Sequence, residues 1–201
     1  MKHVSVLIIV VIYFTCCACK KKVAPSESKE DSNVYKQELV HSNNFLKLMV
    51  TNSITNFCDT VNLDLLLRNH KGVTTNFKEL LSDHEYLFFL YFNETACASC
   101  VQNQFKILQN HPRIVNNKNF KFIIGYRSQR AASVFLNSYG FSSNYLNLID
   151  LKIGINTDMP HIPQYLFINK EGTVLFNYFC DESLNDLTES FLLTIEKRWF
   201  Y

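Results

Sequence analysis

The chain has 201 residues, of which 47% are hydrophobic and 19% are charged, so it is long enough for one folded domain with short appendages and too short for two large domains. Its 17 Phe and 10 Tyr call for a buried core, and five Gly and four Pro are too few for a collagen-like or disordered chain. The formal net charge of +2 gives no basis for a dedicated nucleic-acid binder, because such proteins need clustered cations.

The amino terminus has the pattern of an export signal. A positively charged start precedes an apolar run over residues 4–14, which is shorter than the about 20 apolar residues that a membrane-spanning helix needs. The run leads into Cys16-Cys17-Ala18-Cys19, which resembles the lipobox of bacterial lipoproteins, where the signal peptidase cuts directly before the Cys that carries the lipid. We expect residues 1–18 to be a lipoprotein signal peptide and Cys19 to be lipidated, with Cys17 as the alternative lipid site and a short uncleaved anchor as the other interpretation.

The segment after the signal is polar and charged. Residues 19–33 include three consecutive lysines and almost nothing to bury, so they cannot offset the entropy lost on ordering. We expect a flexible tether there and a single domain over 34–201, in which no repeat of solenoid length occurs. The lipid would hold this domain on a bacterial membrane in the cell envelope, facing the periplasm or the exterior, where disulfides can persist.

Apolar runs and turn residues predict the first elements of the domain. Residues 61–67 predict a strand, Gly72 predicts a turn, and Val73 begins a short second strand. A short helix is expected to follow over 76–81. The sequence therefore places a strand pair and a helix ahead of the most apolar part of the chain.

That most apolar part predicts a strand that leads directly into a helix. Residues 86–92 (Tyr-Leu-Phe-Phe-Leu-Tyr-Phe) are apolar without alternation, which is typical of a central strand covered on both faces. Beyond Cys97 the apolar side chains recur on one helical face, and Pro112 is expected to stop the helix. The residues of that face are Val101, Phe105 and Leu108.

The second half of the domain continues the alternation. A strand is expected over 120–125 and a helix over 129–139. Two further strands, 164–169 and 173–179, flank Lys170-Glu-Gly172 and predict an antiparallel hairpin. The β-α-β-α order followed by a hairpin predicts an α/β fold with a mixed sheet.

The chain is expected to end in a helix. Ser183 and Asp186 have the spacing of a capping box at its start. An apolar stripe follows at helical spacing, and it predicts that Trp199 belongs to the core rather than to a cofactor site. The stripe consists of Leu184, Leu187, Phe191, Ile195 and Trp199.

One motif carries a specific chemical meaning, the Cys97-Ala-Ser-Cys100 sequence between the central strand and its helix. A thiol at a helix amino terminus lies near unpaired backbone N–H groups and the positive end of the helix dipole, which lower its pKa. Cys97 is therefore the expected nucleophile. Cys100 follows one helical turn later and is expected to resolve a mixed disulfide formed on Cys97.

With this motif the chain resembles the thioredoxin superfamily, and within it the exported, membrane-tethered thioredoxin-like reductases and redoxin-type lipoproteins. The resemblance covers about residues 63–198 and rests on the strand-CxxC-helix unit, the Gly-containing turn before it, and Pro160-His-Ile-Pro163 ahead of the hairpin. It implies a thioredoxin-like three-layer fold with helices on both faces of the sheet. It also implies that Pro163 is the family's cis-proline, and that the carbonyl and amide of Ile162 bind a client peptide.

The same resemblance implies the activity. A tethered member of this group reduces the disulfides of client proteins, with electrons supplied by a thiol carrier embedded in the membrane. The CxxC pair needs no cofactor and no metal. The predicted partners are therefore client protein thiols, the membrane donor and the membrane itself through the lipid, with no nucleic acid.

The chain departs from the family pattern in three places. The Trp usually found before the first Cys is Ala96, and the aromatic residue expected three positions earlier is Asn93. Tyr91 stands where cytosolic thioredoxins have a buried acid, so proton transfer needs another group. Glu94 and His161 are the candidates that the sequence offers for this role.

Other interpretations of the cysteines remain open. Structural zinc needs four ligands, and no second CxxC pair is present in the predicted domain over 34–201. A copper-type metallochaperone would use Cys97, Cys100 and His161 as a soft three-ligand site. A static disulfide would instead make the chain a non-enzymatic binding lipoprotein on the same fold. Cys58 and Cys180 are expected to be buried free thiols, with a bridge between them as a weaker alternative.

Overall fold

The computed structural model describes residues 29–141, 143–150, 152–156 and 158–200. Two compact units are distinguished, Met1–Leu39 and Val40–Tyr201. The predicted signal peptide and both candidate lipid sites, Cys19 and Cys17, lie outside the described residues, as does the tether up to residue 28. None of the described helices is long and apolar enough to span a membrane.

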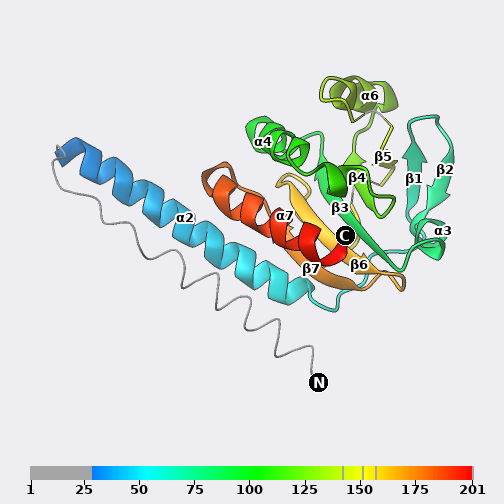
Figure 1. Cartoon of the computed structure of the whole chain (residues 1–201), viewed down its shortest axis with the longest axis horizontal. Coiled ribbons are helices and arrows are strands. Elements are labelled where there is room, and N and C mark those ends of the chain that lie inside the picture. The colour runs from blue at the N-terminus through cyan, green and yellow to red at the C-terminus, as the bar shows by residue number, and fades with distance from the viewer. Residues whose placement is uncertain (1–28, 142, 151, 157, 201) are drawn as a thin grey trace. The chain divides into compact units, whose positions relative to one another are not determined.

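The first described element is helix α2 (Lys29–Asn56), which the sequence patterns do not predict (Figure 1). It begins inside the segment expected to be tether and contains residue 34, the expected domain start. The sequence patterns miss this helix. The reason is that α2 has no strong apolar stripe, and many of its described apolar side chains are exposed. Its carboxyl-terminal part belongs to the second unit, where Met49 is buried in the core and Ser53 Oγ donates to the Asn177 carbonyl.

The described residues of the second unit form one seven-stranded mixed sheet in the order β2-β1-β5-β4-β3-β6-β7. Strands β3, β4 and β5 are parallel, and all other neighbours are antiparallel. The predicted α/β class with a mixed sheet is therefore confirmed. The strands are β1 (Leu66–Asn69), β2 (Thr74–Asn76), β3 (Tyr86–Asn93), β4 (Phe120–Gly125), β5 (Tyr145–Leu148), β6 (Gln164–Asn169) and β7 (Val174–Phe179).

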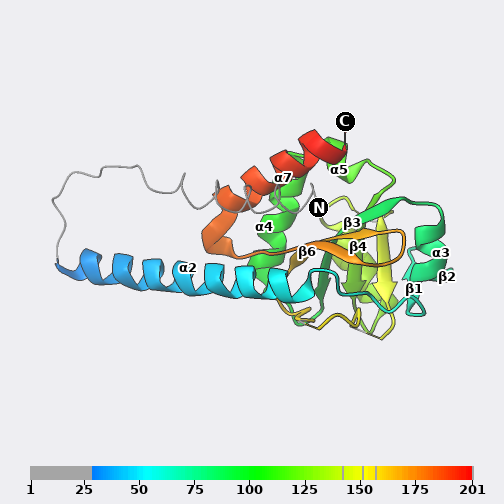
Figure 2. The ribbon, with the colours of Figure 1, turned by 90° about the horizontal axis from the view of Figure 1, so that it is seen from below.

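Helices cover both faces of this sheet, as expected. The core on one face contains side chains from α4, α5, α6 and α7, and the core on the other contains side chains from α3. Figures 1 and 2 show α4 and α7 as neighbours, with α3 next to β2. The helices are α3 (Phe77–Ser82), α4 (Ala98–Gln109), α5 (Pro112–Val115), α6 (Gln129–Asn137), the short 3₁₀ helix η1 (Glu182–Leu184) and α7 (Asn185–Trp199).

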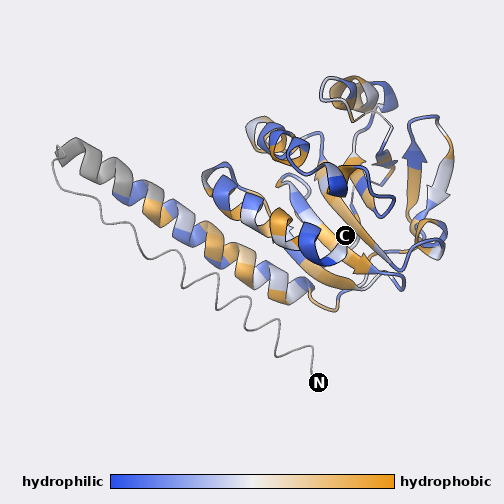
Figure 3. Cartoon of the chain, viewed as in Figure 1, coloured by the Kyte–Doolittle hydropathy of each residue, from blue (hydrophilic) through white to orange (hydrophobic). Residues whose placement is uncertain are grey.

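Strand β3 is the central strand that the sequence predicts. Its side chains alternate between the two cores: Phe88, Leu90 and Phe92 face the α4 side, and the intervening apolar residues face the α3 side. The strand pairs with β4 on one edge and β6 on the other. In Figure 3 the inner strands are coloured as hydrophobic, which is the pattern of a strand buried on both faces.

Two elements of the sheet differ from the sequence expectation. The strand expected over 61–67 is largely replaced by a turn, in which the Asn62 carbonyl accepts from Leu65 N–H and the Asn62 side chain accepts from Asp64 N–H. Such a local Asn turn competes with strand pairing, so β1 begins only at Leu66. Strand β5 is not predicted by the sequence, because its four residues, interrupted by Asn147, carry a weak pattern, and the strand forms by pairing with β1 and β4.

Helix ends differ from the expectation in three places. Helix α4 already ends at Gln109, and Pro112 begins α5, the first-turn position that proline tolerates. The expected capping box of Ser183 and Asp186 does not form; Asp181 instead accepts from Ser183 N–H at 2.9 Å and caps η1. Helix α6 stops at Asn137, two residues before the expected end.

Trp199 lies at the edge of the core, whereas the apolar stripe predicts a place within it. The residue is 45% exposed, and its ring packs against Tyr86 and Phe167 at centroid distances of 5.4 and 4.7 Å. A large ring placed at the last residue of α7 can bury only the face that meets the sheet.

The β6–β7 hairpin turns as predicted and is tightly determined by its sequence. Asn169 Oδ1 accepts from the N–H groups of Glu171 and Thr173, and Gly172 N–H donates to the Asn169 carbonyl at 2.9 Å. Gly172 has φ +78°, a conformation that side chains disfavour. A Cβ there would lie 2.6 Å from Leu63 Cδ2 and 3.2 Å from Val61 Cγ2, so the turn also packs closely on the neighbouring segment.

We predict that Gly172→Ala destabilises the fold more than Gly72→Ala. Both glycines have positive φ, but a Cβ at Gly72 would have no neighbour within 4 Å. Gly72→Ala should cost about 1–2 kcal/mol for the left-handed backbone alone, and Gly172→Ala about 1 kcal/mol more, because Leu63 and buried Val61 must give way. Urea unfolding of the two full-length variants measures the difference, and equal losses would contradict the close approach.

Candidate functional site

The site begins where β3 ends. Asn93 terminates the strand, and its carbonyl and side chain organise the turn by accepting from Ala96 N–H at 3.1 Å and Thr95 N–H at 3.0 Å. Cys97 then occupies the N-cap of α4, and its Sγ accepts from Cys100 N–H at 3.4 Å. The sulfur thus occupies the helix amino terminus, as the motif predicts.

The two thiols of the motif have different environments. Cys97 is exposed, whereas Cys100 is only 9% exposed and lies one turn inside α4. The pKa of Cys97 is lowered from its ordinary value by hydrogen bonds from the Cys100 thiol, the Ser99 hydroxyl and the Cys100 backbone, with Ser99 Oγ 3.2 Å from Cys97 Sγ. Burial and the negative charge of Glu182 oppose this shift.

The pKa of Cys100 moves in the opposite direction. Burial, followed by the neighbouring Cys97 sulfur and the carboxylates of Glu182 and Asp181, raises it to about 12. Cys97 is therefore the thiol of the pair that ionises more readily, and Cys100 keeps its proton at neutral pH. An exposed thiolate beside a protonated second thiol is an arrangement suited to nucleophilic attack on a disulfide.

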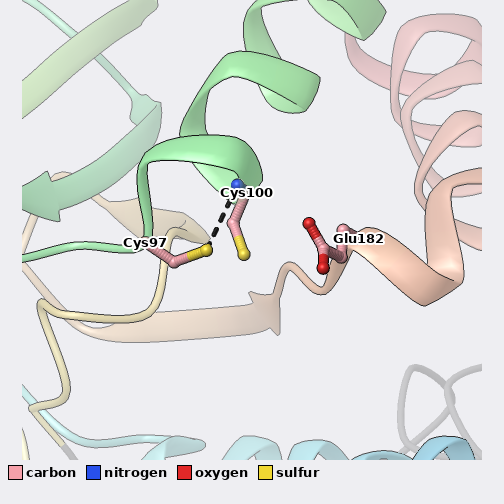
Figure 4. A group of neighbouring side chains, drawn as sticks. All are labelled: Cys97, Cys100 and Glu182. Carbon is pink, nitrogen blue, oxygen red and sulfur yellow. Dashed lines mark hydrogen bonds between the residues drawn. The ribbon is translucent and has the colours of Figure 1, made fainter.

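A third residue, Glu182, completes the cluster, and sequence analysis missed it. Its carboxylate and the two sulfurs lie within 4.8 Å of one another, with the carboxylate pointing toward Cys100 (Figure 4). Glu182 comes from η1, after β7, more than eighty positions along the chain from the cysteines. No local pattern signals this proximity, because only the packing of η1 against α4 creates it.

The cluster also bears on metal binding. Among the described residues, Cys97, Cys100 and Glu182 form the group of potential ligands compact enough for an ion, and it does not include His161. The predicted copper-type ligand set, which includes His161, is therefore wrong. Structural zinc takes four protein ligands, and this group supplies three.

The loop over residues 160–163 lies beside the motif through its backbone. The carbonyl of His161 accepts from Cys97 N–H at 3.4 Å, and the carbonyl of Pro160 accepts from Asn93 N–H at 2.8 Å. Pro163 is buried and Ile162 half-buried. The resemblance correctly predicts that this loop faces the CxxC turn.

Two expectations for the loop are not met. No cis peptide bond occurs among the described residues, so the bond before Pro163 is trans, the form that an X-Pro bond prefers by about 0.5–1 kcal/mol in the absence of other constraints. The Ile162 amide donates to the Met159 carbonyl at 3.0 Å within the loop, and the Pro163 carbonyl accepts from Cys180 N–H at 2.8 Å. The Ile162 amide, which the resemblance assigns to a client peptide, is thus already engaged within the loop.

The remaining described cysteines are free. Cys180 is buried, as expected, and burial and the neighbouring Cys100 raise its pKa well above the ordinary thiol value. Cys58 is exposed, contrary to the expectation, because it sits with φ 66° in the turn after α2, where its backbone and not its side chain joins the core. The two cysteines form no bridge.

Comparison with known proteins gives matches to solved structures alone. No family model matches the sequence, and no curated protein does. A thiol:disulfide interchange protein from Bacteroides sp. is 13% identical over 69% of this chain and 92% of its own, with a TM-score of 0.46. An uncharacterized thioredoxin-like protein from Porphyromonas gingivalis is 15% identical over 68% of this chain and 90% of its own, with a TM-score of 0.49. A cysteine-to-serine mutant of Xanthomonas campestris peroxiredoxin Q is 14% identical over 70% of this chain and 99% of its own, with a TM-score of 0.47.

We predict that the hydrogen bonds to Cys97 Sγ control its reactivity. Ser99→Ala should raise the pKa of Cys97, and Cys100→Ala should raise it further, because the Cys100 thiol makes the larger contribution. Each unit of increase lowers the thiolate fraction about tenfold at a pH below the pKa. The pH dependence of alkylation of Cys97 by iodoacetamide, located by mass spectrometry, measures the effect.

The control for this experiment is Ser190→Ala, which removes an exposed hydroxyl bonded to the Asp186 carbonyl on α7. This variant should leave the alkylation profile of Cys97 unchanged. An unshifted profile in both Ser99→Ala and Cys100→Ala would show that these hydrogen bonds do not set the pKa of Cys97.

Proposed function

We propose that the protein is a thiol-disulfide oxidoreductase that acts through Cys97 and Cys100. One observation carries the proposal: an exposed cysteine with a lowered pKa caps α4, and a second, protonated cysteine lies beside it. A lowered pKa increases the thiolate fraction of Cys97, and exposure lets a partner disulfide reach it. A purely structural thiol needs neither property.

The proposed reaction has two steps. The Cys97 thiolate attacks one sulfur of a client disulfide, so that a mixed disulfide forms and the other client sulfur leaves as a thiolate. Cys100 then attacks Cys97 Sγ, which closes the Cys97–Cys100 disulfide and releases the second client thiol. Two electrons pass from the protein to the client, and a dithiol donor must restore the reduced pair.

The surroundings of the motif support an extended peptide as the client. The 160–163 loop is held against the CxxC turn by backbone hydrogen bonds, and Ile162 and Pro163 directly follow the His161 carbonyl that accepts from Cys97 N–H. A backbone carbonyl can pair with the amide of a bound chain whatever the side chains of that chain are. Client proteins, not small disulfides, are therefore the proposed substrates.

The setting of the reaction is proposed from the amino terminus. A lipid on Cys19 would hold the domain at a bacterial membrane in the cell envelope, on the side where disulfides form. A membrane-embedded thiol carrier would then be the electron donor, and client reduction the direction of flow. Without turnover of the Cys97–Cys100 pair, the same domain would act as a non-enzymatic binding lipoprotein.

We predict a reversible two-thiol transition when the full-length protein is equilibrated with graded mixtures of reduced and oxidised glutathione. Acid quenching, alkylation and mass spectrometry of peptides follow each cysteine separately. The transition should disappear in Cys97→Ser and in Cys100→Ser, because a disulfide needs both sulfurs. Cys100→Ser should also accumulate a glutathione adduct on Cys97, since nothing resolves it.

Cys58→Ser provides the matched control, because it removes an exposed thiol outside the motif and should leave the transition intact. The midpoint of the transition distinguishes a reductant from an oxidant. A dithiol that never oxidises across the series, or a transition that survives loss of either motif cysteine, would favour the binding lipoprotein over the enzyme.

A further inference from the structure

The resolving step leaves a proton unaccounted for. Cys100 is nearly buried and its pKa is raised to about 12, so at neutral pH it holds its proton and is a poor nucleophile. Its attack on Cys97 requires a nearby group that accepts this proton. The question rests on the proposed function, because only a redox-active pair has a resolving step.

The strand position where cytosolic thioredoxins have a buried acid cannot supply the acceptor. Tyr91 is fully buried there, and its hydroxyl donates to Asp158 Oδ1 at 3.0 Å. Burial and then the negative charge of Asp158 raise the pKa of Tyr91 above its ordinary value, so it remains a protonated phenol. Asp158 in turn accepts from the N–H groups of Ile153 and Gly154 and is thereby committed to its own loop.

The two candidates offered by the sequence are also placed unfavourably. The carboxylate of Glu94 pairs with Arg127, with Oε1 3.3 Å from Nε and Oε2 accepting from the Arg127 backbone N–H at 3.2 Å. His161 approaches the motif through its carbonyl, which accepts from Cys97 N–H. Its imidazole does not belong to the compact group around the two sulfurs among the described residues.

Unlike Tyr91, Glu94 and His161, Glu182 lies close to both sulfurs of the motif. Its carboxylate lies within 4.8 Å of both sulfurs, a separation that one bridging water can span (Figure 4). Its side chain makes no ion pair or hydrogen bond within the described parts of the chain, so its oxygens remain available. Asp181 fixes the turn that carries it by accepting from Ser183 N–H at 2.9 Å.

We infer that Glu182 is the proton acceptor for Cys100 in the resolving step. The Glu182 carboxylate takes the thiol proton through one bridging water as the Cys100 sulfur attacks Cys97 Sγ. The Cys97–Cys100 bond forms, the bond from Cys97 to the client sulfur breaks, and the client leaves as a thiolate. That thiolate then takes a proton from Glu182 or from solvent, so no further oxidant or reductant enters.

The charges around Glu182 determine how its removal would act on each step. Cys97 and Cys100 face it from α4, Asp181 adjoins it in the same turn, and His41 of α2 lies 3.7 Å from Asp181. The negative charge of Glu182 raises the pKa of both thiols. Its neutralisation by Glu182→Gln therefore makes both thiols easier to ionise, and on charge alone both steps would become faster. Loss of a proton acceptor would instead slow the second step, the attack of Cys100 on Cys97.

The experiment resolves the two steps with the aromatic disulfide DTNB. The full-length parent carries Cys16→Ser, Cys17→Ser, Cys19→Ser and Cys58→Ser, so that the motif pair and buried Cys180 remain. Attack by Cys97 releases the first coloured thiol, and attack by Cys100 releases the second, which adding Cys100→Ser abolishes. Stopped-flow absorbance follows both releases from about pH 6 to about pH 9, where general-base assistance is measurable.

We expect Glu182→Gln to leave the first release unchanged or faster and to slow the second by about 100-fold at neutral pH. The deficit should shrink as pH rises, because hydroxide then replaces the lost acceptor. Glu182→Asp should recover part of the second release, since it keeps a carboxylate. The matched control Glu94→Gln removes the carboxylate that pairs with Arg127 and should change neither release.

The outcomes separate the inference from the function on which it rests. A second release in Glu182→Gln that is as fast as in the parent, or faster, would overturn the role of Glu182 while the redox pair stands. Slowing in Glu94→Gln in place of Glu182→Gln would overturn it as well. A parent that gives one release and forms no Cys97–Cys100 disulfide would overturn the proposed function and this inference together.

Discussion

The burial of β3 on both faces is the constraint on which the rest of the structure depends. Residues 87–92 are fully buried, and each face of the strand needs its own apolar cover. Helices α4 and α7 supply one cover and α3 the other, while β4 and β6 satisfy the two edges of the strand. A strand enclosed in this way ends abruptly at Asn93, and the first polar turn after it carries the reactive motif to the surface.

The chemistry of the site comes from an asymmetry that one helical turn creates. Cys97 caps α4 from outside and receives hydrogen bonds, while Cys100 lies inside the same turn and loses solvent. The pKa values of two identical side chains three positions apart are therefore driven in opposite directions. The buried Cys180 thiol adds a further desolvated neighbour behind Cys100. An exposed thiol that ionises readily and a protected, protonated thiol result from this local geometry.

The hairpin of β6 and β7 brings the distant parts of the site to the cysteines. Antiparallel pairing of β6 with β3 places the 160–163 loop beside Asn93 and Cys97, as the Pro160 and His161 carbonyl contacts show. The end of β7 returns along β6, and the next turn carries Glu182 to the amino terminus of α4. Gly172 and Asn169, at the far end of the hairpin, maintain the register on which both approaches depend.

The sequence alone determined the features that rest on local pattern: the unalternating β3, the one-sided face of α4, the β6–β7 hairpin with its Gly172 turn, and the position of Cys97 at a helix start. Tertiary structure decided those that depend on partners. Strand β5 exists because β1 and β4 enclose it, the turn at Asn62 displaces a strand, and Pro163 follows a trans bond. Glu182 meets Cys100 only after the sheet is assembled, because side-chain proximity across more than eighty residues leaves no trace in local periodicity.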